Sequence, residues 1–389
     1  MWRVPAEQAF LDTDEKEPMA SEKPTGGDQQ ENQHMKRWTK AALVAVATFA
    51  GTLPALAQDE PITWRMSSYA GETWGLWKNI VMPFTKRVNE LSEGRLVIEP
   101  YPVDVLAPAT KNYEAVLDGT ADAAMITPLY AVNADPANSF YAGHPGGMGP
   151  ETMLYWLYEG GGQDLLTQFK RDTLGLHSLV GGVVGTELWH SHKPIESVAD
   201  LKGLKFRAAG SWASILSEEF EAAPVFVTGG EVYQMLDRGG VDIAEWSGPA
   251  DNQIAGLENA AEYIITPGLH FPAGINEFIV TAEKWDALPD DLKEIVTAAA
   301  KLAVFESYLQ SGMADLVAMK ELRAGNNKLQ ELPAEVTEAI TMAGRKWATT
   351  KAEEQTASGN EWMKKIGESY FAYQDLYADG ASFKHLDRK

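Results

Sequence analysis

Glu245 and Trp246 follow a short apolar run, where a strand would deliver them to a turn. Residues 241–244 have the composition of a buried strand, and Gly248-Pro249 marks the break after it. Ligands of open α/β sheets collect at the carboxyl ends of strands, and a buried carboxylate without a partner is costly. The pair is therefore a candidate ligand site, although surface charge beside a core aromatic ring is the commoner meaning of such a pair.

Arg207 is a second candidate anchor, because it is the last large side chain of a strand predicted over residues 204–208. The net charge of the chain is -22, with a pI near 4.7, which argues against a nucleic-acid partner. An acidic protein can still bind a small anion, since one buried arginine reverses the local field. An exposed arginine on an edge strand is the alternative.

An enzyme is the competing class. His190-x-His192 would place two imidazoles on one face of a strand, as in several metal-dependent hydrolases, with Glu187 or Glu245 as the base. Lys193-Pro194 follows at once, which is typical of a surface turn, and no third ligand lies at helical spacing. The chain has no Gly-x-Ser-x-Gly elbow and no phosphate loop of usable spacing. We therefore expect a protein that performs no catalysis.

The N-terminal part of the chain has the three segments of a secretory signal peptide. Residues 35–57 give a basic start, a short apolar middle and an Ala-x-Ala end, so cleavage after Ala57 and a periplasmic location are predicted. Residues 1–34 are polar and show no regular spacing of apolar residues, which indicates a non-native or mis-called extension. The chain has no cysteine, which excludes disulfides, thiolate catalysis and a lipid-anchored export signal.

The remaining length exceeds one compact core, so two lobes are expected. Strands and helices alternate, which predicts an α/β fold with lobe I over residues 58–181, joined by part of 272–325, and lobe II over 182–271. A helix, a Gly turn and a small-residue strand occur at 112–126 and again at 230–244. Both lobes are therefore predicted to share one plan, with matched strands facing each other across a cleft.

The C-terminal part is predicted to be a helical region over residues 282–389 that spans or covers both lobes. It contains two long helical runs, 290–324 and 335–369, which are unusual for one small lobe. A helix that spans both lobes of a monomer, or an arm exchanged in a homodimer, would explain this length. Strands at 260–265 and 276–280 are candidates for hinge-crossing strands.

Taken together, these residues resemble the periplasmic solute-binding proteins of TRAP (tripartite ATP-independent periplasmic) transporters, the DctP-like family. The resemblance runs over nearly all of 60–380 and rests on the exported start and on three stretches, of which 193–207 is the most specific; the others are 229–233 and 244–249. The Glu245-Trp246 pair resembles the one found in the branch of this family that binds 2-oxo and 2-hydroxy acids. Within this family, the fold is a two-lobed clamshell with hinge-crossing strands.

The resemblance implies a site in which the arginine matching Arg207 forks onto the carboxylate of a small organic acid. The family delivers that acid to a membrane permease; a sensor protein for a membrane receptor would share the clamshell. The resemblance also implies a Ca²⁺ or Na⁺ ion beside the ligand, held by Glu245 and the backbone oxygen of Trp246. Thr186 or Glu187 stands where a glutamine is expected, so either could substitute, or Glu245 could hydrogen-bond the ligand without a cation.

Aromatic and amide side chains complete the predicted site. Pocket linings are found in loops after strands and at helix starts. The candidates there are Trp74, Trp212, Tyr69, Tyr130, Asn276 and Glu277. Any one of the aromatic residues is more often part of the core or the rim.

Overall fold

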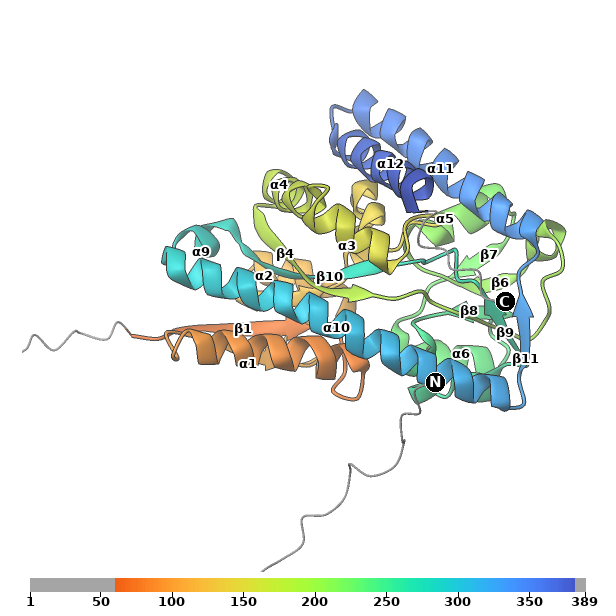
Figure 1. Cartoon of the computed structure of the whole chain (residues 1–389), viewed down its shortest axis with the longest axis horizontal. Coiled ribbons are helices and arrows are strands. Elements are labelled where there is room, and N and C mark those ends of the chain that lie inside the picture. Colours follow the sequence, from red (N-terminus) through yellow and green to blue (C-terminus); the bar gives the residue numbers. More distant parts are fainter. Residues whose placement is uncertain (1–59, 382–389) are drawn as a thin grey trace, which may run out of the picture. The chain divides into compact units, whose positions relative to one another are not determined.

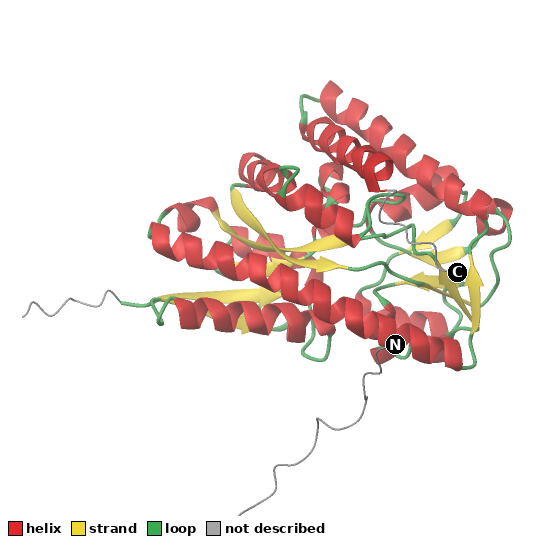
Figure 2. Ribbon diagram, in the orientation of Figure 1, coloured by secondary structure: helices red, strands yellow, loops and turns green. Residues whose placement is uncertain are grey.

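The structure is a computed structural model that describes residues 60–381. The predicted extension and signal peptide, residues 1–34 and 35–57, lie outside the described residues. The described part contains two sheets covered by helices (Figures 1 and 2). The prediction of a mixed α/β fold is confirmed. Within residues 60–381, no helix is both long and apolar enough to span a bilayer.

The first sheet has the strand order β2-β1-β3-β10-β4. β1 pairs in parallel with β2 and β3, whereas β10 runs antiparallel to both β3 and β4. The helical segments that follow its strands are η1 (Trp77–Val81), α1 (Met82–Leu91) and α2 (Asn112–Leu117). The bounds of the strands are Ile62–Ser68 for β1, Leu96–Tyr101 for β2, Ala123–Ile126 for β3, Leu176–Val184 for β4 and Gly274–Thr281 for β10.

The second sheet repeats this plan. β6 pairs in parallel with β7 and β8, as β1 does with β2 and β3, and β5 lies antiparallel to β8 as β10 does to β3. Its order is β11-β9-β5-β8-β6-β7. The strands are β5 (Trp189–Ser191), β6 (Lys205–Arg207), β7 (Ala223–Val225), β8 (Ile243–Glu245), β9 (Tyr263–Thr266) and β11 (Lys328–Glu331). The helices that accompany them are α5 (Gly210–Glu219), α6 (Val232–Asp237), α7 (Pro249–Ile254) and α8 (Leu257–Ala260).

Three segments connect the sheets: residues 185–188, residues 267–273 and helix α10 (Asp290–Ala324). β9 stays in the second sheet and β10 in the first, so the chain crosses between these strands rather than along them. Apolar residues in the first half of α10, such as Val296, pack in the core of the first sheet. Leu322, near its end, packs on Leu188, which directly precedes β5, and on Ile264 of β9 in the second sheet. The helix therefore spans both lobes.

The C-terminal region differs from the predicted single run over 335–369. α11 (Ala334–Ala357) and α12 (Trp362–Gly380) form an antiparallel pair, separated at Gly359, whose φ of 88° is a left-handed conformation that a helix cannot contain. α12 packs on α3 (Pro150–Tyr158) and α4 (Gly162–Leu174). β11, which precedes α11, adds a strand within the region predicted to be helical, because it pairs in parallel with β9.

A buried ion pair lies in the first lobe. The Lys170 ammonium donates to Glu277 Oε1 at 2.9 Å, Tyr113 Oη at 2.8 Å and Asn138 Oδ1 at 2.7 Å, and both charged side chains are fully buried. Ser178 Oγ donates to Glu277 Oε2 at 2.5 Å, and Tyr113 also donates to Glu277. Glu277, which was a candidate for the ligand site, is thus occupied by partners in the core.

Candidate functional site

A cavity of about 250 Å³ lies where the matched strands of the two sheets end. Thr127 and Tyr130 follow β3, and Trp246 and Gly248 follow β8, as the repeated helix-turn-strand pattern predicts. The loop after β1, the end of β6 and the start of β10 contribute Tyr69, Trp74, Gly75, Arg207 and Asn276 to the lining. The cavity is therefore built by the strand ends of both sheets, where open α/β sheets bind ligands.

Arg207 lines this cavity and is only 3% exposed. Its Nη1 donates to the Glu245 carbonyl at 2.6 Å and to Glu245 Oε2 at 2.7 Å, while Nε and Nη2 both donate to the Val227 carbonyl, at 3.2 and 3.0 Å. A guanidinium has five N–H donors. Among the described residues, four donors are engaged, which leaves one on Nη2. The protein itself thus occupies the two-donor fork that the sequence predicted for the ligand.

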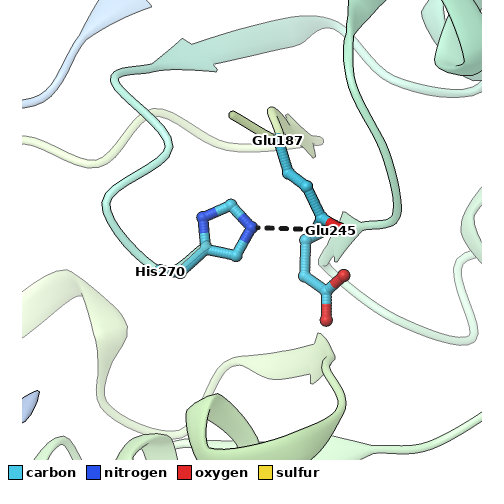
Figure 3. A group of neighbouring side chains, drawn as sticks. All are labelled: Glu187, Glu245 and His270. Atoms are coloured by element: carbon cyan, nitrogen blue, oxygen red, sulfur yellow. Dashed lines mark hydrogen bonds and ion pairs between the residues drawn. The ribbon is translucent and has the colours of Figure 1, made fainter. Parts of the chain in front are cut away.

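Glu245 is the last residue of β8 and is the ion-pair partner of Arg207. Its Oε2 takes the ion pair, and its Oε1 accepts the backbone N–H of Ala209 at 2.9 Å. The carboxylate of Glu187, from the segment between β4 and β5, lies close by, and together with His270 these side chains have ligand atoms within 4.8 Å of one another (Figure 3). Burial first, and the negative charge of Glu245 second, raise the pKa of Glu187 well above its usual range.

His270 is a hydrogen-bond donor in this cluster. The indole Nε1–H of Trp189 can only donate, and it donates to His270 Nδ1 at 2.7 Å. The proton of the neutral ring is therefore on Nε2, which lies 3.3 Å from Glu187 Oε2 (Figure 3). Burial lowers the pKa of His270 to about 3, so the ring is neutral at pH 7. With Nε2 protonated, His270 orients Glu187 rather than binding a metal ion.

Asn276 presents a free donor at the cavity. Tyr69 Oη donates to Asn276 Oδ1 at 2.5 Å, whereas Asn276 Nδ2 is buried and has no partner among the described residues. Asn276 and Glu277 are consecutive residues of β10 and point to opposite faces of the first sheet, while the register shift beside them comes from an extra residue, Gly181, in β4. Asn276 accordingly lines the cavity, whereas Glu277 binds Lys170 in the core. An unpaired buried donor is costly, so this amide is suited to an acceptor oxygen of a ligand.

The structure brings most of the predicted site residues together. Five of them line the cavity, and Glu245 binds Arg207 directly; the five are Arg207, Trp246, Trp74, Asn276 and Glu187. Tyr69 and Tyr130, the other aromatic candidates, line it too.

Two predicted ligand residues do not lie at the cavity. Trp212, on the first turn of α5, is 3% exposed and packs on Trp189 and Phe206, because this turn faces the core of the second sheet. Thr186 donates its hydroxyl to the Pro272 carbonyl at 2.8 Å and lines a neighbouring cavity. The first is a core residue, and the second ties together the two segments that cross between the sheets.

The histidine pair of the alternative enzyme reading forms no metal site. His190 contacts Asn252 Nδ2 at 3.1 Å, and His192 contacts the Leu236 carbonyl at 2.9 Å. Over residues 60–381, the cluster of Glu187, Glu245 and His270 is the one group of three such side chains whose ligand atoms converge. The two imidazoles therefore have structural partners.

Sequence reasoning missed two acids of the cavity, Asp251 and Asp315. Asp251 lies three residues after Gly248, in α7, and its sequence context gives only a weak indication that it lines the cavity. Asp315 is the one charged residue between Glu306 and Lys320 of α10. A lone acid in an otherwise uncharged helical stretch is a signal that could have identified it.

Direct contacts join the two lobes across the cavity. The rings of Trp74 and Trp246 meet edge to face, with centroids 5.2 Å apart. Asp251 Oδ1 accepts the backbone N–H of Gly75 at 3.0 Å, and Ser247 Oγ contacts Asp251 Oδ2 at 3.3 Å. Gly75 follows β1 and Asp251 lies in α7, so this hydrogen bond holds the lobes in a closed arrangement.

We expect Asp251→Ala to weaken ligand retention. Hydrogen bonds to charged groups contribute about 1.5–3 kcal/mol, so loss of the Gly75 contact should raise the ligand dissociation rate by about 10–100-fold. Stopped-flow tryptophan fluorescence measures this rate. Asp118→Ala is the matched control, because Asp118 also accepts a backbone N–H, from Thr120, but at an exposed turn. Equal dissociation rates for wild type and Asp251→Ala would show that this contact does not hold the lobes together.

Comparison with known proteins places this geometry in a family. The family model for bacterial extracellular solute-binding proteins of family 7 (DctP) matches residues 67–355. A curated relative, the monocarboxylate 2-oxoacid-binding periplasmic protein of Nostoc sp., is 28% identical over 351 residues, which cover 87% of this chain and 94% of the relative.

Solved structures of similar fold carry ligands. The TRAP periplasmic solute-binding protein from Pseudoalteromonas atlantica, solved with sodium and pyruvate, is 28% identical, with a TM-score of 0.76, and the match covers 84% of this chain and all of that one. The protein from Colwellia psychrerythraea, solved with calcium and pyruvate, has the same identity and TM-score, and the match covers 84% of this chain and 98% of that one.

Proposed function

This chain belongs to the bacterial extracellular solute-binding proteins of family 7, the DctP family, and from that premise we propose that it captures a short 2-oxo or 2-hydroxy monocarboxylic acid. The family is periplasmic, works with the membrane permease of a TRAP transporter and performs no catalysis. The observation that carries the proposal is the position of Arg207, buried and lining a cavity between the two sheets.

The donors of the cavity favour a ligand with two neighbouring oxygens. Arg207 Nη2 retains one N–H, and Asn276 Nδ2 is buried without a partner. A ligand carboxylate also competes with Glu245 for Nη1, because both are carboxylates and both are drawn to the same guanidinium. The 2-oxo or 2-hydroxy oxygen, next to the carboxylate, gives the ligand a second acceptor for Asn276.

The charge of the site supports a monocarboxylate bound together with a cation. Glu245 already pairs with Arg207, so an anionic ligand would add a second negative charge beside one buried guanidinium, and ionised Glu187 a third. Ca²⁺ and Na⁺ prefer oxygen ligands, and carboxylates are the common ones. Glu187, Glu245 and the backbone oxygen of Trp246 are the residues we propose to hold the ion. When bound, the ion would neutralise part of the charge that now raises the pKa of Glu187.

We expect pyruvate to raise the melting temperature of the protein and Ca²⁺ to increase the effect. A ligand at 100 times its dissociation constant stabilises the folded state by about 2.7 kcal/mol, which is a shift of several degrees. Glu187→Gln should remove the Ca²⁺ dependence, because it takes away one of the two carboxylate ligands of the proposed ion site. Thermal unfolding with pyruvate, with and without Ca²⁺ or Na⁺, measures both effects.

The matched control is Glu218→Gln, which makes the same change at an exposed position of α5. It should retain the responses of the wild type. A wild-type protein that responds to no 2-oxo or 2-hydroxy acid in such a screen would contradict the proposed ligand class. A response to pyruvate that is unchanged by Ca²⁺, Na⁺ and Glu187→Gln would contradict only the cation.

A further inference from the structure

A second cavity, of about 320 Å³, adjoins the ligand cavity. Four residues line both cavities: Val183, Gly185, Ser311 and Asp315. Asp315 is the charged one of the four. The rest of the second cavity is lined largely by apolar side chains from the crossing segments and α10, among them Leu188, Pro267, Tyr308, Leu316 and Met319. The boundary between the two cavities therefore contains one carboxyl group, that of Asp315.

The Asp315 carboxyl group is fixed between two glycines. Its Oδ1 accepts the backbone N–H of Ala250 at 3.0 Å. A Cβ placed on Gly248 would lie 2.9 Å from both carboxylate oxygens, and a Cβ on Gly185 would lie 3.5 Å from Oδ2. Gly248 follows β8 and Gly185 follows β4, so the side chain from α10 fills the gap between the two sheets. A larger residue than glycine at 248 would displace it.

Building on the proposed function, we propose that Asp315 is a specificity-determining residue that separates the two cavities and restricts the ligand to a short acid without a second carboxylate. The restriction on length is steric. An aliphatic tail that outgrows the ligand cavity would have to enter the second cavity, whose apolar lining suits it, and Asp315 stands between them.

The restriction on charge is electrostatic. Asp251 also lines the ligand cavity and lies near Asp315, so a distal carboxylate would meet two acids. Burial raises the pKa of Asp315 to about 6, and the group is therefore ionised at pH 7.5. Lys78 lines the same cavity, but this side chain is exposed and its charge is screened by solvent. The repulsion from the two acids should therefore prevail over the attraction of Lys78.

Two variants separate size from charge. Asp315→Ala removes the side chain that separates the two cavities. Asp315→Asn keeps the size of the side chain and an oxygen that accepts the Ala250 N–H, but it removes the charge. Isothermal titration calorimetry at pH 7.5 with pyruvate, 2-oxohexanoate and 2-oxoglutarate compares a short acid, one longer by three methylenes and a dicarboxylate. The wild type should bind pyruvate most tightly. Asp290→Asn is the control, because it makes the same change at the exposed start of α10.

Asp315→Ala should improve the affinity for 2-oxohexanoate relative to pyruvate by at least about 10-fold. Each buried methylene contributes about four-fold, and three are added. Asp315→Asn should leave this ratio unchanged and improve the affinity for 2-oxoglutarate relative to pyruvate on the order of 10-fold, since one like charge is removed. Asp290→Asn should show the ratios of the wild type.

The outcomes distinguish this inference from the proposed function. A wild type that binds none of the three acids contradicts the proposed function itself. A wild type that binds pyruvate, together with variants whose affinity ratios stay within two-fold of the wild type, overturns the role of Asp315 and leaves the proposed function intact. If Asp315→Ala does not fold, the 2-oxoglutarate ratio of Asp315→Asn decides the question.

Discussion

Replacing Arg207 by methionine should abolish carboxylate binding and destabilise the protein at the same time. Arg207 and Glu245 form a buried ion pair at 2.7 Å, so removal of the guanidinium leaves an unpaired buried carboxylate. Breaking such a pair lowers the free energy of unfolding by about 3–5 kcal/mol. Loss of a desolvated charge contact to the ligand should lower its affinity by on the order of 1000-fold. Urea unfolding and isothermal titration calorimetry with pyruvate measure the two effects.

A double variant separates these two effects. Glu245→Gln keeps an oxygen to accept the Ala209 N–H but carries no charge, so Arg207→Met with Glu245→Gln should recover most of the lost stability. It should not recover binding, because the ligand still lacks the guanidinium. A double variant that binds pyruvate as tightly as the wild type would show that the carboxylate is anchored elsewhere.

Replacing Lys170 by methionine should destabilise the protein to a similar extent but leave the ligand affinity unchanged. Lys170 and Glu277 are fully buried, and three acceptors surround the ammonium. Its removal leaves Glu277 charged in the core of the first lobe, which lowers the free energy of unfolding by about 3–5 kcal/mol. Neither residue lines the cavity. Urea unfolding gives the loss, and calorimetry at a temperature well below the melting point gives the affinity.

Adding Glu277→Gln to Lys170→Met should recover most of this loss of stability. The amide oxygen of the new side chain still accepts a hydrogen bond from Tyr113 or Ser178, and no unpaired charge remains buried. Lys86→Met is the control for removal of a lysine. Lys86 faces Glu90 at 3.8 Å with both side chains largely exposed, so the variant should change stability by about 0.5 kcal/mol or less. A Lys170→Met protein as stable as the wild type would show that the buried ion pair does not stabilise the fold.

The fold was predictable where local patterns decide it. The repeated helix, Gly turn and small-residue strand at 112–126 and 230–244 predicted two lobes on one plan, and the structure has β3 and β8 in equivalent places. Helix α10 has the predicted bounds, because its run of helix-forming residues is long and contains no proline. β11 could not be predicted from its own sequence, since a short exposed strand is defined by its pairing with β9.

Within the candidate site, strand-end position was a reliable guide to the cavity and residue type alone was not. Arg207 ends β6 and Trp246 directly follows β8, and both line the cavity, whereas Trp212 lies in the first turn of α5 and packs in the core. Asn276 and Glu277 were equal candidates in sequence. They point to opposite faces of β10, and only the packing of the two sheets decides that the first face meets the cavity and the second the core.

The sequence by itself determined the class of this protein: two α/β lobes, long C-terminal helices, and an arginine, a glutamate and a tryptophan at strand ends. Those features follow from the spacing of apolar residues and from the breaks that end each predicted strand, which are local properties of the chain. Only the tertiary structure decided how the charges are paired, with four donors of Arg207 engaged by the protein, His270 oriented by Trp189, and Asp315 placed between two cavities. Each of these depends on residues far apart in the chain, and their distances are set by the packing of the two sheets.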